Sequence, residues 1–286
     1  MPKPCSARLC VAALGLLVTA CDVDAMLATD SRTPPETASP IEDEPPVEDL
    51  PCHVALAGKD VVAVPTGDFE APKAHAPLMV DGCSRDVVWS EQDWISLNYP
   101  WMGVEPDPAD YEGVFKLAWT EERLYILVEV VDDLLNPTLA DGLENYWKGD
   151  YVEVFLDEDR SGGIHQYNHQ AFAYHVSTEG HAIDKDTAQR TTFFDDHVEV
   201  ARTREGNRHL WEMAIDIYAD DFDDNRDDNT PIVLTQNKTL GFSLAYGDND
   251  GNQSRENFMG SRETHGPGND AGYVNADVFG SIVLVE

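Results

Sequence analysis

Residues 143–163 have the sequence LENYWKGDYVEVFLDEDRSGG. Residues 151–156, at the centre of this stretch, are rich in the β-branched and aromatic side chains that strands favour. Aliphatic side chains recur there with a period of two, which predicts a strand with one buried face and one acidic face. The aliphatic face carries Val152, Val154 and Leu156, and the opposite face carries Glu153 and Asp157.

Carboxylates surround this predicted strand, and carboxylate oxygens are ligands that Ca²⁺ prefers. Asp150 precedes the strand, Glu153 lies within it and Asp157 follows it, while Asp132 ends an earlier apolar run. We expect these four residues to be the donors of a structural calcium site whose ligands come from separate loops. The alternative is a solvated acidic turn beside a core aromatic residue.

The motif Trp-x-x-Asp-Tyr-Val-Glu-Val-Phe-Leu-Asp, which begins at Trp147, resembles the central motif of family 9 carbohydrate-binding modules. The resemblance extends to residues 61–286 and implies a calcium-containing β-sandwich that binds sugar chains. Four further segments resemble the family in the same order: residues 78–89, 123–133, 241–255 and 277–284.

Short apolar runs separated by turns continue through the rest of these residues, and no long stripe with a helical period occurs. This pattern predicts a single antiparallel β-sandwich, jelly-roll or immunoglobulin-like, with few helices. The predicted strands are residues 61–64, 77–80, 114–119, 124–131, 151–156, 170–176, 197–202, 209–217, 240–246 and 279–285.

The charge of the chain excludes two classes of partner. Its 286 residues include 19 Lys and Arg against 54 Asp and Glu, which gives a formal net charge of −35. Nucleic-acid binding requires a basic surface, and electrostatic docking on anionic lipid requires basic clusters. We therefore expect neither, and we expect membrane contact only through a covalent anchor.

The N-terminal residues are typical of export. Residues 1–20 combine basic side chains, a short apolar run and small residues, which predicts a secretory signal peptide. The sequence before Cys21 resembles a bacterial lipobox, which implies lipidation of Cys21 and a cell-envelope lipoprotein in the inner or outer membrane. An ordinary signal peptide is the alternative. Residues 21–60 are acidic and Pro-rich, which predicts a disordered tether.

The cysteines fit an oxidising compartment. Cys5 and Cys10 would leave with the signal peptide, and Cys21 would carry lipid. Cys52 and Cys83 remain as an even pair, for which we expect a disulfide between tether and domain. Two free thiols are the alternative.

The resemblance implies a sugar clamped between two aromatic side chains. Trp147 aligns with the first, and Tyr273, shortly before the last strand, stands where the second is expected. Tyr146 is a substitute for either. Packing at the rim or in the core is the alternative role of Trp147. An Arg expected on the strand after the central motif is replaced, with Ala173 or a neighbour in its place.

Several polar residues and alternative functions complete the set of hypotheses. Gln170, His175 and Asn249 are candidates for hydroxyl contacts.

No nucleophile or metalloprotease motif is present, so we expect no enzyme, and any hydrolase association would come from relatives fused to glycoside hydrolases. The favoured role is glycan capture in carbohydrate catabolism, and accessory action in a glycoside-hydrolase system is an alternative. A haem-binding redox sandwich is another, with ligands from Met102, Met213, Met259 and the histidines; the loose spacing of His165, His169, His175 and His181 does not indicate zinc.

Overall fold

The computed structural model describes most of the chain from residue 60 onward, together with Cys52. The chain divides into two units, residues 1–44 and 45–286, and every described residue belongs to the second. The expected signal peptide, Cys21 and nearly all of the expected tether lie outside the described residues. Among the described helices, none is long and apolar enough to cross a membrane. The described residues are 52, 60–251, 254–264 and 271–286.

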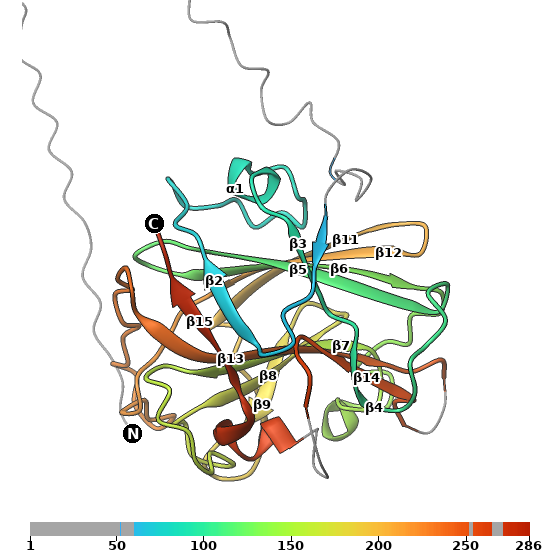
Figure 1. The fold of residues 1–286 in the computed structure, drawn as a ribbon. Helices are drawn as coiled ribbons and strands as arrows, with labels where there is room; N and C mark the ends of the chain where they lie inside the picture. The colour runs from blue at the N-terminus through green and yellow to red at the C-terminus, as the bar shows by residue number, and fades with distance from the viewer. Residues whose placement is uncertain (1–51, 53–59, 252–253, 265–270) are drawn as a thin grey trace, which may run out of the picture. The chain divides into compact units, whose positions relative to one another are not determined.

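Two sheets form a sandwich, as the sequence predicts (Figure 1). The smaller sheet has six strands and contains the long hairpin of β5 and β6. Its order is β1 (Val61–Val62), β3 (Trp94–Ser96), β5 (Tyr111–Trp119), β6 (Leu124–Asp132), β12 (Arg208–Ile215) and β11 (Val198–Glu205).

The larger sheet has nine strands, with the central motif as β7 near its middle. Seven strands follow one path, β15 (Gly280–Leu284) pairs with β13, and β2 (Asp68–Ala71) pairs with β15. Only the pairs β1–β3 and β2–β15 are parallel among the described strands. The path is β10 (Thr191–Phe193), β9 (Ala182–Lys185), β8 (Phe172–Ser177), β7 (Tyr151–Asp157), β13 (Thr239–Asp248), β14 (Asn257–Gly260) and β4 (Tyr99–Met102).

The core lies between the sheets and follows the period of two. Val152, Val154 and Leu156 of β7 are buried there against aliphatic and aromatic side chains from both sheets. Burial of each such aliphatic side chain contributes about 1.5–3 kcal/mol. The same alternation directs Tyr151, Glu153, Phe155 and Asp157 to the outer face of the larger sheet, so the strand that builds the core also places side chains outside it.

A covering segment closes the outer face of the smaller sheet. Trp89 of α1 (Val87–Ser90) and Trp94 pack on that face. The buried carboxylate of Glu212 accepts hydrogen bonds from Trp89 Nε1 at 2.9 Å and from the backbone N of Asp81 and of Gly82 at 3.0 and 3.1 Å. This face is therefore occupied by the chain itself.

Cys52 and Cys83 are joined by a disulfide at the edge of this covering segment. The backbone N of Ser84 donates to the carbonyl of Cys52 at 3.0 Å, and Thr203 Oγ1 of β11 donates to the carbonyl of Gly82 at 2.6 Å. The bridge thus attaches residue 52 beside the smaller sheet.

The prediction of a strand at residues 77–80 is wrong. Leu78 and Val80 pack on the outer face of the smaller sheet from an irregular segment, so their apolar character reflects this packing and not strand pairing.

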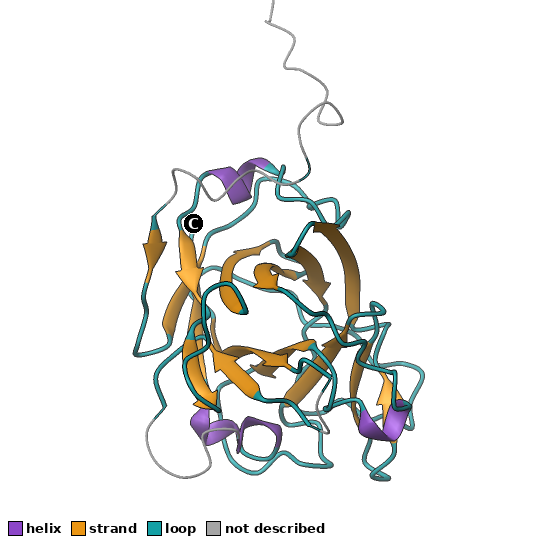
Figure 2. Cartoon of the chain, turned by 90° about the vertical axis from the view of Figure 1, so that its right-hand side faces the viewer, coloured by secondary structure: helices purple, strands orange, loops and turns teal. Residues whose placement is uncertain are grey.

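The scarcity of helices is confirmed, since the described residues contain one four-residue α-helix and three 3₁₀ turns, all in loops outside the sheets (Figure 2). The 3₁₀ turns are η2 (Leu143–Asn145), η3 (Ala271–Tyr273) and η4 (Ala276–Val278).

Candidate functional site

A cavity of about 330 Å³ opens on the outer face of the larger sheet. Glu153 of β7 and His175 of β8 are register partners at its floor, and both point away from the core because their neighbours along each strand point into it. Its walls come from loops and from the neighbouring strand β9. The remaining lining residues are Glu144, Tyr146, Trp147, Gln166, Tyr167, Lys185, Arg255 and Tyr273.

Two of the lining aromatic side chains are open to solvent. Trp147, in the loop after η2, is 40% exposed, and Tyr273, in η3, is 50% exposed. Tyr146 is buried and meets the ring of His175 edge-on, with ring centroids 4.6 Å apart. The three aromatic residues named from the sequence therefore line one cavity, two of them with accessible faces and the third within its wall.

The loop that carries Trp147 is held from below by buried polar groups. Asn249 Nδ2 donates to the carbonyl of Lys148, next to Trp147, and the backbone N of Asn249 donates to Asp150 Oδ1 at 2.8 Å. Asp150 Oδ2 accepts from the backbone N of Asn136. Asn249 and Asp150 do not line the cavity; they fix the backbone on the C-terminal side of Trp147.

We expect Asn249→Ala to reduce the free energy of unfolding by about 1–3 kcal/mol, because the partly buried carbonyl of Lys148 loses its donor. The loop would also loosen around Trp147, so ligand affinity should fall as well. Denaturant unfolding and ligand titration measure the two effects. Asn145→Ala is a matched control, since Asn145 makes a similar but exposed bond to the carbonyl of Asp141. Equal losses in both variants would contradict the bracing role.

His165 and Phe155 contact Gly272, the neighbour of Tyr273 in η3. His165 Nε2 lies 2.7 Å from the carbonyl oxygen of Gly272, so this nitrogen carries the proton and donates. Burial lowers the pKa of His165, which keeps the ring neutral. A Cβ atom at Gly272 would lie 2.6 Å from the ring of Phe155, so only glycine lets η3 rest on the sheet at this point.

The floor of the cavity combines a carboxylate with a neutral histidine. Glu153 Oε2 lies 3.4 Å from His175 Nε2, and both side chains are buried. Burial, helped by the positive charge of Arg255, lowers the pKa of His175 to about 3. Arg255 lies over the ring of Phe258 at 4.1 Å and donates to the hydroxyl of Tyr151. Lys185 Nζ donates to Thr191 Oγ1 at 2.5 Å.

The other candidates from the sequence lie elsewhere. Gln170 is exposed, beside a different hollow that Glu158 and Tyr218 also line. Met213 and Met259 are buried in the apolar core, and Met102 packs against the cluster on the outer face of the larger sheet.

Sequence reasoning missed five lining residues. Arg255 belongs to one of the family-like segments, which was its only signal, and Tyr167 adopts a left-handed φ of 66° that the sequence does not reveal. The other three come from loops and from β9, which pairs with β8: Glu144, Gln166 and Lys185.

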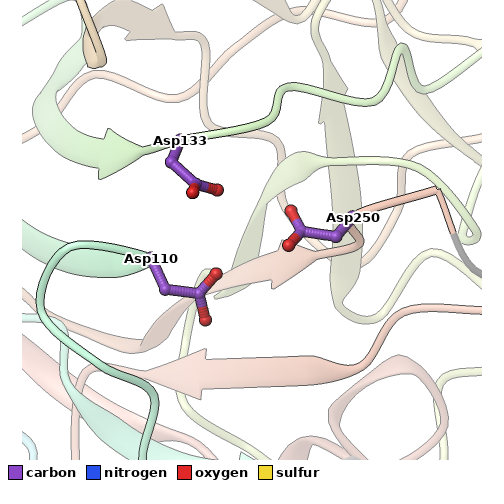
Figure 3. A group of neighbouring side chains, drawn as sticks. All are labelled: Asp110, Asp133 and Asp250. Atoms are coloured by element: carbon purple, nitrogen blue, oxygen red, sulfur yellow. The ribbon is translucent and has the colours of Figure 1, made fainter.

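A separate group of carboxylates lies at the ends of β5, β6 and β13. Figure 3 shows Asp110, Asp133 and Asp250 turned toward one another, with one carboxylate oxygen from each within 4.8 Å of the others. Asp132 joins Asp248 and Asp250 in an overlapping group. Such a set of oxygen donors fits Ca²⁺, which takes about six to eight of them.

Only Asp132 of the four expected calcium donors belongs to such a group within the described residues. Asp150 accepts from the backbone of Asn136 and of Asn249. Glu153 lines the cavity, and Asp157 Oδ2 accepts from the backbone N of Gly162 at 2.8 Å. The structure therefore does not bring these four carboxylates together.

The chain belongs to the carbohydrate family 9 binding domain-like family, whose model matches residues 80–286. Among curated proteins, none matches the chain.

Solved structures that are similar in fold include the following three. Two hold a family 9 carbohydrate-binding module from Caldicellulosiruptor kristjanssonii. Its cellotriose complex has a TM-score of 0.54 at 20% identity and covers 76% of this chain and 93% of that chain. Its glucose complex has a TM-score of 0.53 at 19% identity and covers 75% and 95%. A putative carbohydrate-binding protein from Bacteroides uniformis has a TM-score of 0.51 at 12% identity and covers 76% and 98%.

Proposed function

We propose that the domain binds carbohydrate in the cavity and does not transform it. The observation that carries this proposal is the pair of exposed aromatic rings, Trp147 and Tyr273, on one cavity with a polar floor. Membership of the carbohydrate family 9 binding domain-like family supports it, as do the glucose and cellotriose in the two Caldicellulosiruptor kristjanssonii complexes.

The residues suit the two surfaces of a sugar ring. The C–H face of a pyranose is apolar and packs on an aromatic face, while its hydroxyls require hydrogen bonds. Glu153 accepts such bonds, and Arg255, Lys185 and Gln166 donate them. A volume of about 330 Å³ is near the lower end of ligand pockets, which suits a short sugar.

We expect Trp147→Ala to weaken sugar binding by roughly ten- to a hundred-fold, because a buried aromatic contact contributes about 1.5–3 kcal/mol. Isothermal titration against glucose, cellotriose and a wider oligosaccharide panel measures the loss. Phe193→Ala is the matched control, since Phe193 is 43% exposed and does not line the cavity. Absence of heat with every sugar for the folded wild-type chain would refute the proposal.

We propose further that the cluster of carboxylates at the ends of β5, β6 and β13 binds calcium in a structural role. Asp132 and Asp248 are buried with like charges near them, and a cation would neutralise those charges. The residues that would hold it are Asp110, Asp132, Asp133, Asp248, Asp250 and Glu256.

The wider role that we infer is capture of glycan fragments at the cell envelope for carbohydrate catabolism, with the domain carried on a lipid anchor at Cys21. The N-terminal sequence and the acidic tether support this inference. Fatty-acid labelling of the wild-type chain and of Cys21→Ser tests the anchor; equal labelling of both would exclude it.

A further inference from the structure

A second, smaller hollow adjoins the cavity on its β8–β9 side. It has a volume of about 30 Å³, and we call it the annex. Six of its lining residues also line the cavity, so the two spaces share a wall and lie side by side. The shared residues are Tyr146, Gln166, Tyr167, His175, Lys185 and Tyr273.

The residues that line only the annex give it a fixed polar wall. The carboxylate of Asp184 accepts from the backbone N of Ala173 at 2.9 Å through Oδ2 and from the backbone N of Lys185 at 2.7 Å through Oδ1. These two bonds hold the carboxylate in one orientation, and each oxygen keeps a further acceptor site. Desolvation raises the pKa of Asp184 to about 7, in keeping with its shielded position.

The annex has the size and chemistry for one hydroxyl group. Its volume exceeds the roughly 10–15 Å³ that a polar hollow needs to hold one water molecule, so it has room for a small polar substituent. A polar hollow of this size holds water when the site is free, and a ligand that displaces the water must reproduce its hydrogen bonds. A sugar hydroxyl can do so, because it donates and accepts in the same way as water.

We propose that the annex is a subsite for one hydroxyl or hydroxymethyl substituent of the sugar ring held in the cavity, and that Asp184 accepts its hydrogen bond. This inference rests on the proposed carbohydrate binding. It deepens that function by naming the ligand class: sugars with a free hydroxyl at the ring position that faces the annex. An analogue without that hydroxyl leaves the carboxylate of Asp184 without its partner.

The test is titration of the full chain with D-glucose and with its monodeoxy analogues. A hydrogen bond to a carboxylate is stronger than a neutral one, so we expect one analogue to bind at least roughly ten-fold more weakly than glucose. In Asp184→Asn, glucose should bind nearly as weakly as that analogue, and the difference between the two ligands should shrink below about two-fold. In the same variant, the affinities for the analogues that lack a hydroxyl at another ring position should keep their wild-type ratios to the affinity for glucose.

A second variant fills the annex without changing a charge. Ala171 is buried and lines the annex but not the cavity, so Ala171→Val should abolish the same preference. Ala118→Val, an equally small change at a buried site on the smaller sheet, is the matched control and should keep it. Melting temperatures establish that each variant is folded.

The outcomes separate the two proposals. If glucose binds and the annex variants discriminate among the deoxy analogues as the wild type does, the annex is not a subsite while sugar binding stands. Equal binding of all analogues by the wild type leads to the same conclusion. If neither glucose nor any other sugar binds to the folded chain, the proposed function fails and the annex proposal fails with it.

Discussion

In the presence of a chelator, the contribution of three buried carboxyls to the free energy of unfolding is expected to fall by about 6–7 kcal/mol between pH 6 and pH 9. Burial, followed by the nearby charge of Asp132, raises the pKa of Asp150 to about 9. Burial also raises the pKa of Asp248 and of Glu212 to about 7. In the unfolded chain such carboxyls titrate near pH 4.

The sign follows from proton binding. Above pH 4 the folded domain holds protons on these three carboxyls that the unfolded chain has already lost, so stability decreases as the pH rises. The decrease runs through pH 7 for Asp248 and Glu212 and continues to about pH 9 for Asp150. Each pKa unit corresponds to about 1.4 kcal/mol, which sets the scale of the effect.

Denaturant unfolding at several pH values, with chelator and with calcium, measures this dependence. Calcium should restore stability at high pH, because the ion binds the deprotonated form of Asp248 and its neighbours. Asp248→Asn should reduce the slope near pH 7 in chelator and leave the part due to Asp150, whereas Asp227→Asn, at an exposed position, should leave the curve unchanged. A flat profile in chelator, or a slope that calcium does not alter, would contradict the expectation.

The sequence predicted the parts of the site that depend on local pattern. The period of two in β7 assigned Val152 and Val154 to the core and Glu153 to the outer face. The position of Trp147 just before that strand placed it at a loop, where the structure leaves it partly exposed beside the cavity. Tyr273 was named through the family resemblance, which implies a second aromatic residue shortly before the last strand.

The rest of the site depends on tertiary placement. Lys185 and Arg255 reach the cavity from β9 and from the segment before β14, and no local pattern marks either. Asn249 is polar and close to a turn, which made it a candidate for ligand contact, but its buried amide supports the loop of Trp147 instead. Among 54 acidic residues, the sequence cannot show that Asp110 and Asp248 meet.

Replacement of both Cys52 and Cys83 by serine is expected to lower the free energy of unfolding by about 3–4 kcal/mol and to leave sugar affinity within about two-fold. The loss follows from the loop that the bridge closes, since its cysteines are 31 residues apart and the unfolded chain gains that freedom. Denaturant unfolding and sugar titration of the double variant measure the two quantities. Unchanged stability would show that the covering segment is held by its own packing.

The expected independence of affinity follows from the arrangement of the sandwich. Cys83 lies beside the carboxylate of Glu212, on the outer face of the smaller sheet, whereas the cavity opens on the outer face of the larger one. The core between the sheets separates the two surfaces, so loss of a peripheral link reaches the cavity only if the sheets shift. A large loss of affinity in the double variant would therefore mean that the bridge fixes how the two sheets pack on each other. The position of Trp147 would then depend on contacts at the opposite face of the domain.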